Sequence, residues 1–304
     1  MINRTLLLGN GLNRAFRKDR FSWSNLMVKL EKLSDIPIAN LENKPLPLVF
    51  EQLRLNDMYF GKNPNHLLKS ISSIFFVNSE NKLEEIYSKI TKNVLSTNYT
   101  HLPFFNHEKK FNIPKQKFPN INENTHSLFR SHQFKNLNVW NIHGSAYVHT
   151  SILLGHNQYA KYSAQIRDYL YKGVKYSKSP SPYKSTLLTS TPDFKFDAEG
   201  KVYSWIDLFL RDEIHVVGFG MDFTENILWW LLTEKIALQL KYPRHVGPFI
   251  YYKVIVKDYP DSIRQQAVME MMRDIGVRII EVEAETYYDG YVNIANKLKP
   301  GVVK

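Results

Sequence analysis

The sequence predicts an α/β fold, a doubly wound parallel sheet interrupted by helical and irregular insertions. Two observations lead to this prediction. Apolar runs of strand length alternate with helical patterns in the last third of the chain, and four apolar runs end in polar or glycine-rich turns. Alternating strands and helices at this spacing build a parallel sheet covered by helices on both faces. Ligands bind such a sheet at the carboxyl ends of its strands.

The first half of the chain supplies three of the core strands. The first, residues 5–8, ends in Gly9-Asn10-Gly11, and the next two are expected at residues 93–98 and 138–142. Helical spacing of apolar residues predicts an insertion of helices at about 20–90. A polar, proline-containing stretch predicts an irregular insertion at about 101–136. The helices expected in the first insertion cover residues 24–33, 48–55, 66–75 and 82–90.

The second half returns to regular alternation. A helix over residues 157–171 and a stretch rich in Ser, Pro, Lys and Tyr form an insertion at about 157–205. We find no repeat and no domain linker, so the chain is interpreted as one Rossmann-like domain, residues 1–304. The elements expected after the insertion are strands at 213–217, 249–256 and 277–282, and helices at 223–240, 262–275 and 288–298.

Composition excludes several classes of chemistry. The 304 residues are 43% hydrophobic and 23% charged, which argues against general disorder. The absence of cysteine excludes disulfides, a cysteine nucleophile, iron–sulfur clusters and cysteine-based zinc sites.

No grouping of His, Asp and Glu has metal-ligand spacing, so no metal is expected. We see neither a signal peptide nor an apolar run long enough to cross a bilayer, and we expect a cytoplasmic protein without membrane contact.

The first glycine turn could hold a phosphate. Gly9 and Gly11 allow the backbone to approach a ligand, and the following helix would present its N-terminal amides. A full dinucleotide fingerprint would have a third glycine where Arg14 stands and an acidic residue after the second strand, and the chain has neither. An ordinary hydride-transferring enzyme is therefore disfavoured. The alternative is a plain strand–helix turn.

Two side chains at strand ends are candidates for chemistry. Asn98 could hold a ribose hydroxyl or a water molecule, or it could merely form a turn. His143 could act as a general base near neutral pH, although a lone histidine is more often structural. His156 could face the same site or only begin the next helix, with Asn157 as its cap. His215 lies in mid-strand and is expected to be a sheet residue.

The last cluster, Gly218-Phe219-Gly220-Met221-Asp222, predicts a second glycine turn opposite the first. Asp222 is followed three residues later by Glu225, which is the pattern of a helix N-cap with a capping box. We therefore expect Asp222 to cap the helix at 223–240.

Together, these motifs resemble the sirtuin-like NAD-hydrolase domains of bacterial anti-phage defence, including the Thoeris-type effectors, and the related abortive-infection H family. The resemblance rests on the Gly-Asn-Gly turn, Thr-Asn-Tyr-Thr at 97–100, Ile-His-Gly-Ser at 142–145 and Val-Val-Gly-x-Gly-x-Asp at 216–222. The motifs occur in the family's order and extend from Leu6 to about Leu232.

The resemblance implies a single sirtuin-like Rossmann domain that hydrolyses NAD to nicotinamide and ADP-ribose as an abortive-infection effector. Asn98 and His143 would be the catalytic pair, with Asn98 positioning the nicotinamide ribose or the attacking water and His143 contacting a ribose hydroxyl or deprotonating the water. NAD would be the substrate, with no other cofactor and no metal. The residues expected to bind NAD are Gly9, Asn10, Gly11, Asn13, Arg14, Thr97, Tyr99, Thr100, Gly144, Ser145, His156, Gly218, Gly220 and Asp222.

Two departures from the family pattern matter. Many sirtuin-like sequences have an acidic residue where Thr100 stands, and this difference affects how the nicotinamide amide would be bound. The abortive-infection branch also has Thr there. Protein-deacetylating sirtuins carry a zinc module of four cysteines, and its absence here argues against lysine deacylation.

The net charge of +11 is concentrated in the middle of the chain. Residues 108–184 contain twelve Lys or Arg and three acidic residues. This basic segment would attract a polyanion, or it is a solvated lysine-rich surface. Two alternatives to the enzyme therefore stay open: a non-catalytic NAD- or ADP-ribose-binding sensor or scaffold, and a nucleic-acid-contacting protein. A partner defence protein or phage-derived trigger and homo-oligomer formation are also expected.

Overall fold

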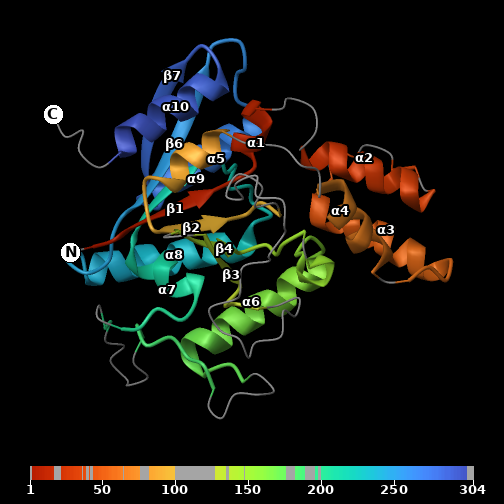
Figure 1. Cartoon of the computed structure of the whole chain (residues 1–304), viewed down its shortest axis with the longest axis horizontal. Coiled ribbons are helices and arrows are strands. Elements are labelled where there is room, and N and C mark those ends of the chain that lie inside the picture. The colour runs from red at the N-terminus through yellow and green to blue at the C-terminus, as the bar shows by residue number, and fades with distance from the viewer. Residues whose placement is uncertain are drawn as a thin grey trace.

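The structure is a computed structural model built around a seven-stranded sheet (Figure 1). The residues it describes are 2–16, 22–35, 37–38, 41, 44–63, 65–75, 82–99, 127–134, 137–146, 148–175, 182–188, 196–197 and 200–299. The strand order is β3-β4-β2-β1-β5-β6-β7, and all neighbours are parallel except β3 and β4. The α/β prediction is therefore confirmed. The strands are β1 (Arg4–Leu8), β2 (Asn93–Ser96), β3 (Ser131–Phe134), β4 (Leu137–Asn141), β5 (Glu213–Val217), β6 (Phe249–Val256) and β7 (Arg278–Ala284).

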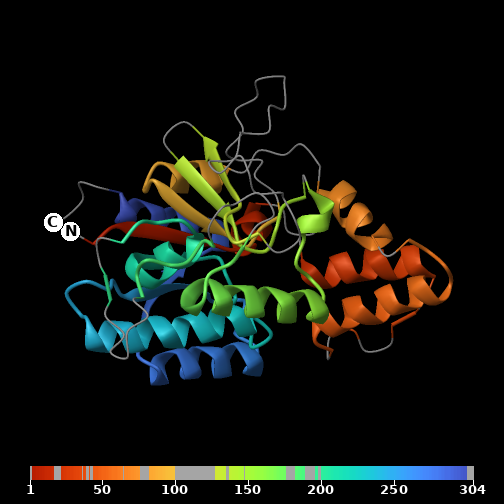
Figure 2. The ribbon, with the colours of Figure 1, turned by 90° about the horizontal axis from the view of Figure 1, so that it is seen from below.

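Helices cover both faces of the sheet because the central strands are apolar on both sides. In β1, Leu6 packs on the face covered by α1 (Gly11–Phe16), α5 (Lys82–Ser88) and α10 (Tyr287–Leu298). Leu7 packs on the opposite face, against a second core layer. That layer includes α6 (His156–Tyr171), α7 (Trp205–Arg211), α8 (Asn226–Lys241) and α9 (Ile263–Asp274). Figure 2 shows α6 and α8 running along this face.

Three further helices form a helical lobe beside the sheet: α2 (Trp23–Ser34), α3 (Leu46–Tyr59) and α4 (His66–Phe75) (Figures 1 and 2). The lobe has its own apolar core, which includes Leu30, Phe50 and Leu53. Tyr99 and Ile152 from the strand-end loops belong to the same cluster, so the lobe packs against the edge of the sheet where candidate site residues lie.

Several elements have other end points than predicted: the helix expected at 48–55 is Leu46–Tyr59, and the strand expected at 93–98 ends at Ser96. Three elements differ more from the sequence prediction. Strand β3 lies within the segment expected to be irregular; it pairs antiparallel with β4, as Ser131 opposite Trp140 shows. Helix α7 follows the expected insertion at 157–205, where no helix was predicted. The helix expected from residue 223 begins at Asn226, because residues 223 and 224 form a turn. Most of the predicted insertion at 101–136 lies outside the described residues.

Within the described ranges, every helix is too short or too polar to cross a lipid bilayer.

Candidate functional site

The ends of β1, β2, β4 and β5 lie in one row. Leu8 pairs with both Ser96 and Val217, and Ser96 pairs with Asn141. Because these strands are parallel, their carboxyl ends meet at the same edge of the sheet. The chain builds outward from β1 through β2 and β4 on one side, and through β5, β6 and β7 on the other. The edge between β1 and β5 is thus the topological switch point of the sheet.

Asn98 and His143 follow the neighbouring strands β2 and β4, each at the same number of residues beyond a pair of residues that lie opposite each other in the sheet. Each stands two residues beyond a register pair, Ser96 with Asn141, and the backbone amide of Ile142 continues the pairing by donating to the Ser96 carbonyl at 3.0 Å. Both side chains are nearly closed to solvent, at 5% and 4% exposure. The topology therefore brings these two residues to one buried edge of the sheet.

Asn98 is held by the first glycine turn. Its Nδ2 donates to the Gly9 carbonyl at 3.3 Å, and its backbone amide donates to Ser96 Oγ at 3.2 Å. Asn141 Nδ2 donates to the Asn98 carbonyl at 3.5 Å. The amide side chain is thus anchored to the turn that follows β1.

His143 faces a carboxylate that the sequence analysis assigned only to a capping box. Its Nε2 lies 3.3 Å from Glu225 Oε2, which is ion-pair distance without hydrogen-bond alignment. Glu225 is the N-cap residue of α8, but its side chain makes no capping hydrogen bond. The Glu225 carboxylate therefore faces the imidazole of His143 and is not used on the backbone amides of α8. The sequence offered no signal for this contact, because the capping pattern alone explained the half-buried Glu225.

Two tyrosines surround this pair. The His143 ring meets the Tyr159 ring edge to face, with centroids 5.8 Å apart. The Tyr99 hydroxyl donates to the Leu153 carbonyl at 2.7 Å. Burial, and secondly the charge of Glu225, raises the pKa of both phenols well above its ordinary value. Both hydroxyls consequently stay neutral donors across the physiological range.

The glycines of the first turn are required by packing within the protein. A Cβ added to Gly9 would lie 2.4 Å from Phe219 Cα, and one added to Gly11 would lie 2.7 Å from the Gly218 carbonyl oxygen. The amide of Gly9 donates to the Val217 carbonyl at 3.0 Å, and that of Gly11 donates to the Gly218 carbonyl at 2.6 Å. These two amides are therefore engaged with the end of β5 and are not presented to a phosphate.

Gly144 is likewise explained by its surroundings. Its φ of +95° favours glycine, and an added Cβ would lie 2.0 Å from the Ser151 carbonyl oxygen. Ser145, fully buried, donates its backbone amide to Ser151 Oγ at 2.9 Å. The turn after His143 is thus fixed against the 3₁₀ turn at His149–Ser151.

Of the other residues predicted to bind NAD, some are buried in hydrogen bonds within the protein and others are exposed. Thr97 is buried and donates to the Leu8 carbonyl through both its amide, at 3.1 Å, and its Oγ1, at 3.3 Å. Asn13 Nδ2 donates to Asn10 Oδ1 at 3.2 Å, and Arg14 is exposed at the end of α1. Thr100 lies outside the described residues.

His156 is the first residue of α6, and its side chain is exposed. The alternative that Asn157 caps this helix is wrong, because Gly155 is the N-cap residue. The amide of Gly155 donates to Gln158 Oε1 at 3.0 Å. Asn157 instead donates its amide to Glu51 Oε1 of the helical lobe at 3.0 Å. His215 is a buried sheet residue, as expected; its ring contacts Glu213 and Tyr252.

Asp222 does not cap the helix as predicted. Its Oδ1 accepts from the amide of Thr224 at 2.9 Å, and Arg264 forms a bidentate pair with it at 2.6 and 2.8 Å. Burial acts to raise the pKa of the Asp222 carboxyl, but the hydrogen bonds from Arg264 and Thr224 outweigh it and lower that pKa. The helix begins three residues later because the aspartate is already used in the preceding turn.

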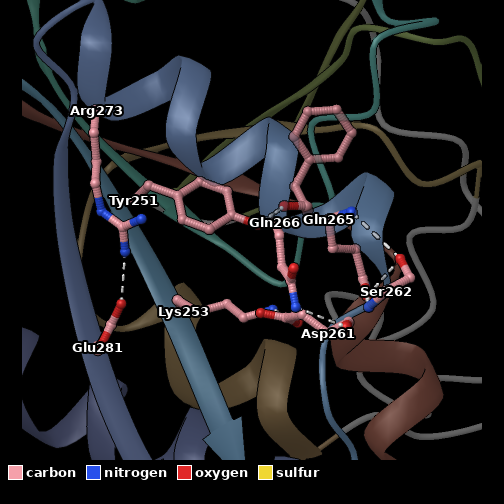
Figure 3. A network of polar contacts seen from close by, with 9 residues as sticks. Tyr251, Lys253, Asp261, Ser262, Gln265, Gln266, Arg273 and Glu281 are labelled. Atoms are coloured by element: carbon pink, nitrogen blue, oxygen red, sulfur yellow. Dashed lines mark hydrogen bonds and ion pairs between the residues drawn. The ribbon is translucent and has the colours of Figure 1, made fainter.

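The second glycine turn is fastened to β6. The Tyr251 hydroxyl donates to the Phe219 carbonyl at 2.7 Å, and nearby Lys253 pairs with Asp261 (Figure 3). Gly218 has φ +66°, and a Cβ there would lie 2.6 Å from Leu12 Cδ1. Gly220 differs, because a Cβ added there would meet no atom within 4 Å. Gly220 is thus the one predicted glycine whose small size is not explained by contacts among the described residues.

The basic segment at 108–184 is only partly described. Arg130 is buried, so its charge is not on the surface, and Lys172 pairs with Asp168 at 3.7 Å. Lys161 and Arg167 lie on α6, and Lys172 is its C-cap residue. Six basic residues of the segment lie outside the described ranges: Lys109, Lys110, Lys115, Lys117, Lys135 and Lys178.

In the described part of the chain, no three His, Asp or Glu side chains gather as metal ligands would. No protein-family model matches the chain, and a comparison with curated proteins finds no match either.

Proposed function

We propose that this chain hydrolyses NAD to nicotinamide and ADP-ribose as an effector of anti-phage defence. The observation that carries the proposal is the buried edge where Asn98 and His143 follow neighbouring strands and Glu225 stands 3.3 Å from the imidazole. The sequence resemblance described above supplies the substrate class.

The reaction suits these groups. The bond between ribose C1′ and the nicotinamide nitrogen breaks, its electron pair stays on the nitrogen, and nicotinamide leaves as a neutral heterocycle. Water then bonds to the positively charged sugar carbon and releases a proton. Asn98 would hold the ribose or the water through its side-chain amide, and His143 would accept the proton, with the Glu225 carboxylate stabilising the resulting imidazolium.

The phosphates would be bound differently from those of a standard dinucleotide site. Because the Gly9 and Gly11 amides are engaged with β5, we assign the pyrophosphate contact to the exposed Arg14 guanidinium. The open space at Gly220 would allow the adenosine half to approach the second turn.

Incubation of the purified chain with NAD, followed by chromatographic separation of the products, tests this proposal. We expect nicotinamide and ADP-ribose from the wild type, and a loss of at least about 100-fold in Asn98→Ala and His143→Ala. His245→Ala, at an exposed histidine beyond the end of α8, is the matched control and should retain activity. Full turnover in both site variants would contradict the assignment, and a cyclic product would contradict hydrolysis.

The second candidate is a non-catalytic sensor or scaffold that binds NAD or ADP-ribose. The burial of Asn98 and His143, together with the hydrogen bond from Asn98 to Gly9, favours it. Calorimetry distinguishes the two functions: heat of NAD binding with no product formed selects the sensor.

A further inference from the structure

Exposed apolar side chains gather on the helical lobe. Among the described residues, seven of the thirteen exposed large hydrophobic side chains belong to residues 28–60. The most exposed are Tyr59 at 84% and Phe60 at 66%, at the end of α3, with their rings 5.2 Å apart. At about 150–250 Å² per fully accessible aromatic side chain, these two present roughly 200–400 Å² to water. A patch of this size is comparable to the largest apolar patch on a typical monomer, which is often functional.

The two aromatic residues stand on a firmly capped helix end. Gly61 adopts φ +71°, its amide donates to the Met58 carbonyl at 3.0 Å, and the Lys62 amide donates to the Asp57 carbonyl at 2.8 Å. This is the Schellman pattern of helix termination. The turn that carries Tyr59 and Phe60 therefore has a defined conformation, which reduces the entropy lost on binding.

A polar cluster ties the same turn to the neighbouring helices. The buried Asp57 carboxylate lies 3.4 Å from Lys62 Nζ and 3.1 Å from His66 Nδ1 of α4. Lys62 Nζ also donates to the Leu33 carbonyl of α2 at 3.1 Å. The ends of α2 and α3 and the start of α4 are thus joined, and exposed Leu33 lies beside the same cluster. We call Leu33, Leu55, Met58, Tyr59 and Phe60 the tip patch.

The exposed charge of the described part of the helical lobe is mostly positive. Of the described acidic residues in 22–75, Glu31, Glu51 and Asp57 are bonded within the lobe, which leaves Asp35 as the exposed one. Exposed lysines stand at 29, 32, 44 and 69. A second copy of the chain would bring lysines against lysines, whereas a partner with acidic residues beside its apolar ones would complement this surface.

We propose that the tip patch is the docking site for a partner protein, through an amphipathic helix with an acidic rim. The apolar side chains of that helix would cover Tyr59 and Phe60, and its carboxylates would face Lys32 and its neighbours. The inference is independent of the proposed hydrolysis, because it concerns a surface on the lobe and a different set of residues.

Fluorescence anisotropy with three labelled helical peptides tests the proposal on the full chain. The peptides share one apolar face and differ in rim residues: glutamate, glutamine or lysine. We expect the glutamate peptide to bind at least tenfold tighter than the glutamine peptide and to weaken with salt. Tyr59→Ser combined with Phe60→Ser should reduce binding at least tenfold. Leu240→Ser, an equally exposed apolar position on α8, should leave it unchanged.

Four outcomes would overturn the proposal. Equal binding of the three peptides would remove the charge argument, and binding unaffected by the double substitution would place the site elsewhere. A wild-type dimer that the double substitution converts to monomer in sedimentation would make a second copy the occupant. Binding to phosphatidylglycerol vesicles that the same substitution abolishes would make it a membrane surface.

Discussion

Lys235 should make the stability of this fold depend on pH in the mildly alkaline range. The side chain is fully buried on α8, and its Nζ donates to the Asp212 carbonyl at 2.7 Å and to the Leu210 carbonyl at 3.4 Å. Burial lowers the pKa of this lysine from 10.5 to about 7, although the nearby carboxylates of Asp212 and Glu213 act in the opposite direction. Below pH 7 the folded protein must therefore hold a poorly solvated charge.

The sign follows from proton binding. Between pH 7 and pH 10.5 the unfolded chain keeps the proton on this lysine and the folded chain has released it, so stability rises with pH in that window. The destabilisation is complete below the folded pKa and vanishes above the unfolded one. At about 1.4 kcal/mol per pH unit, and with half the proton lost at pH 7, the free energy of unfolding should rise by about 2 kcal/mol from pH 7 to pH 9.

Urea denaturation of the wild type and of Lys235→Met at pH 7, 8 and 9 measures this effect. The methionine leaves two backbone carbonyls without their donor, which lowers stability equally at each pH, so the slope with pH is the quantity to compare. We expect the wild type to gain about 2 kcal/mol relative to Lys235→Met. Lys257→Met, at an exposed lysine, should give the wild-type slope. Parallel curves for the wild type and Lys235→Met would refute the reasoning.

Three further predictions follow from contacts at the strand ends. Gly9→Ala should lower the free energy of unfolding by about 1–3 kcal/mol because its Cβ would meet backbone, whereas Gly220→Ala should leave the thermal midpoint nearly unchanged. Equal midpoints would contradict the packing explanation. Tyr99→Phe should cost about 1–3 kcal/mol in urea denaturation, since the buried Leu153 carbonyl loses its donor; a neutral effect would speak against that bond. Glu225→Gln should reduce NAD turnover by about 10²–10⁴-fold with normal folding by circular dichroism, and unchanged turnover would exclude the carboxylate from the reaction.

Elements with a distinct hydrophobic pattern were predictable from the sequence. Strands β5 and β6 have the predicted bounds because both are apolar runs ended by glycine or charged residues. Strand β3 could not be found, since Ser-His-Gln-Phe has no apolar run and forms only by pairing with β4. Helix α7 was missed because six consecutive residues, from Trp205, are buried, which removes the amphipathic period.

The positions of the candidate site residues could be predicted where the order of the strands determines them, but not where side-chain packing does. The order of parallel strands is enough to bring Asn98 and His143 to one edge. The contact of His143 with Glu225 depends on how α8 begins, which in turn depends on the pairing of Asp222 with Arg264. Local sequence spacing contains no information on a partner 42 residues away.

The pairing of β1 with β5 has a consequence for how the chain folds. Thr5 lies opposite Ile214 in the sheet, and its hydroxyl donates to Asp212, 207 residues later. Until β5 has left the ribosome, the central strand β1 has β2 as a neighbour on one side and an unpaired backbone on the other. Contacts at such sequence separation slow folding and leave apolar strands open to association. Truncation before Glu213 should accordingly yield aggregates, and expression at low temperature or with chaperones should favour the intact chain.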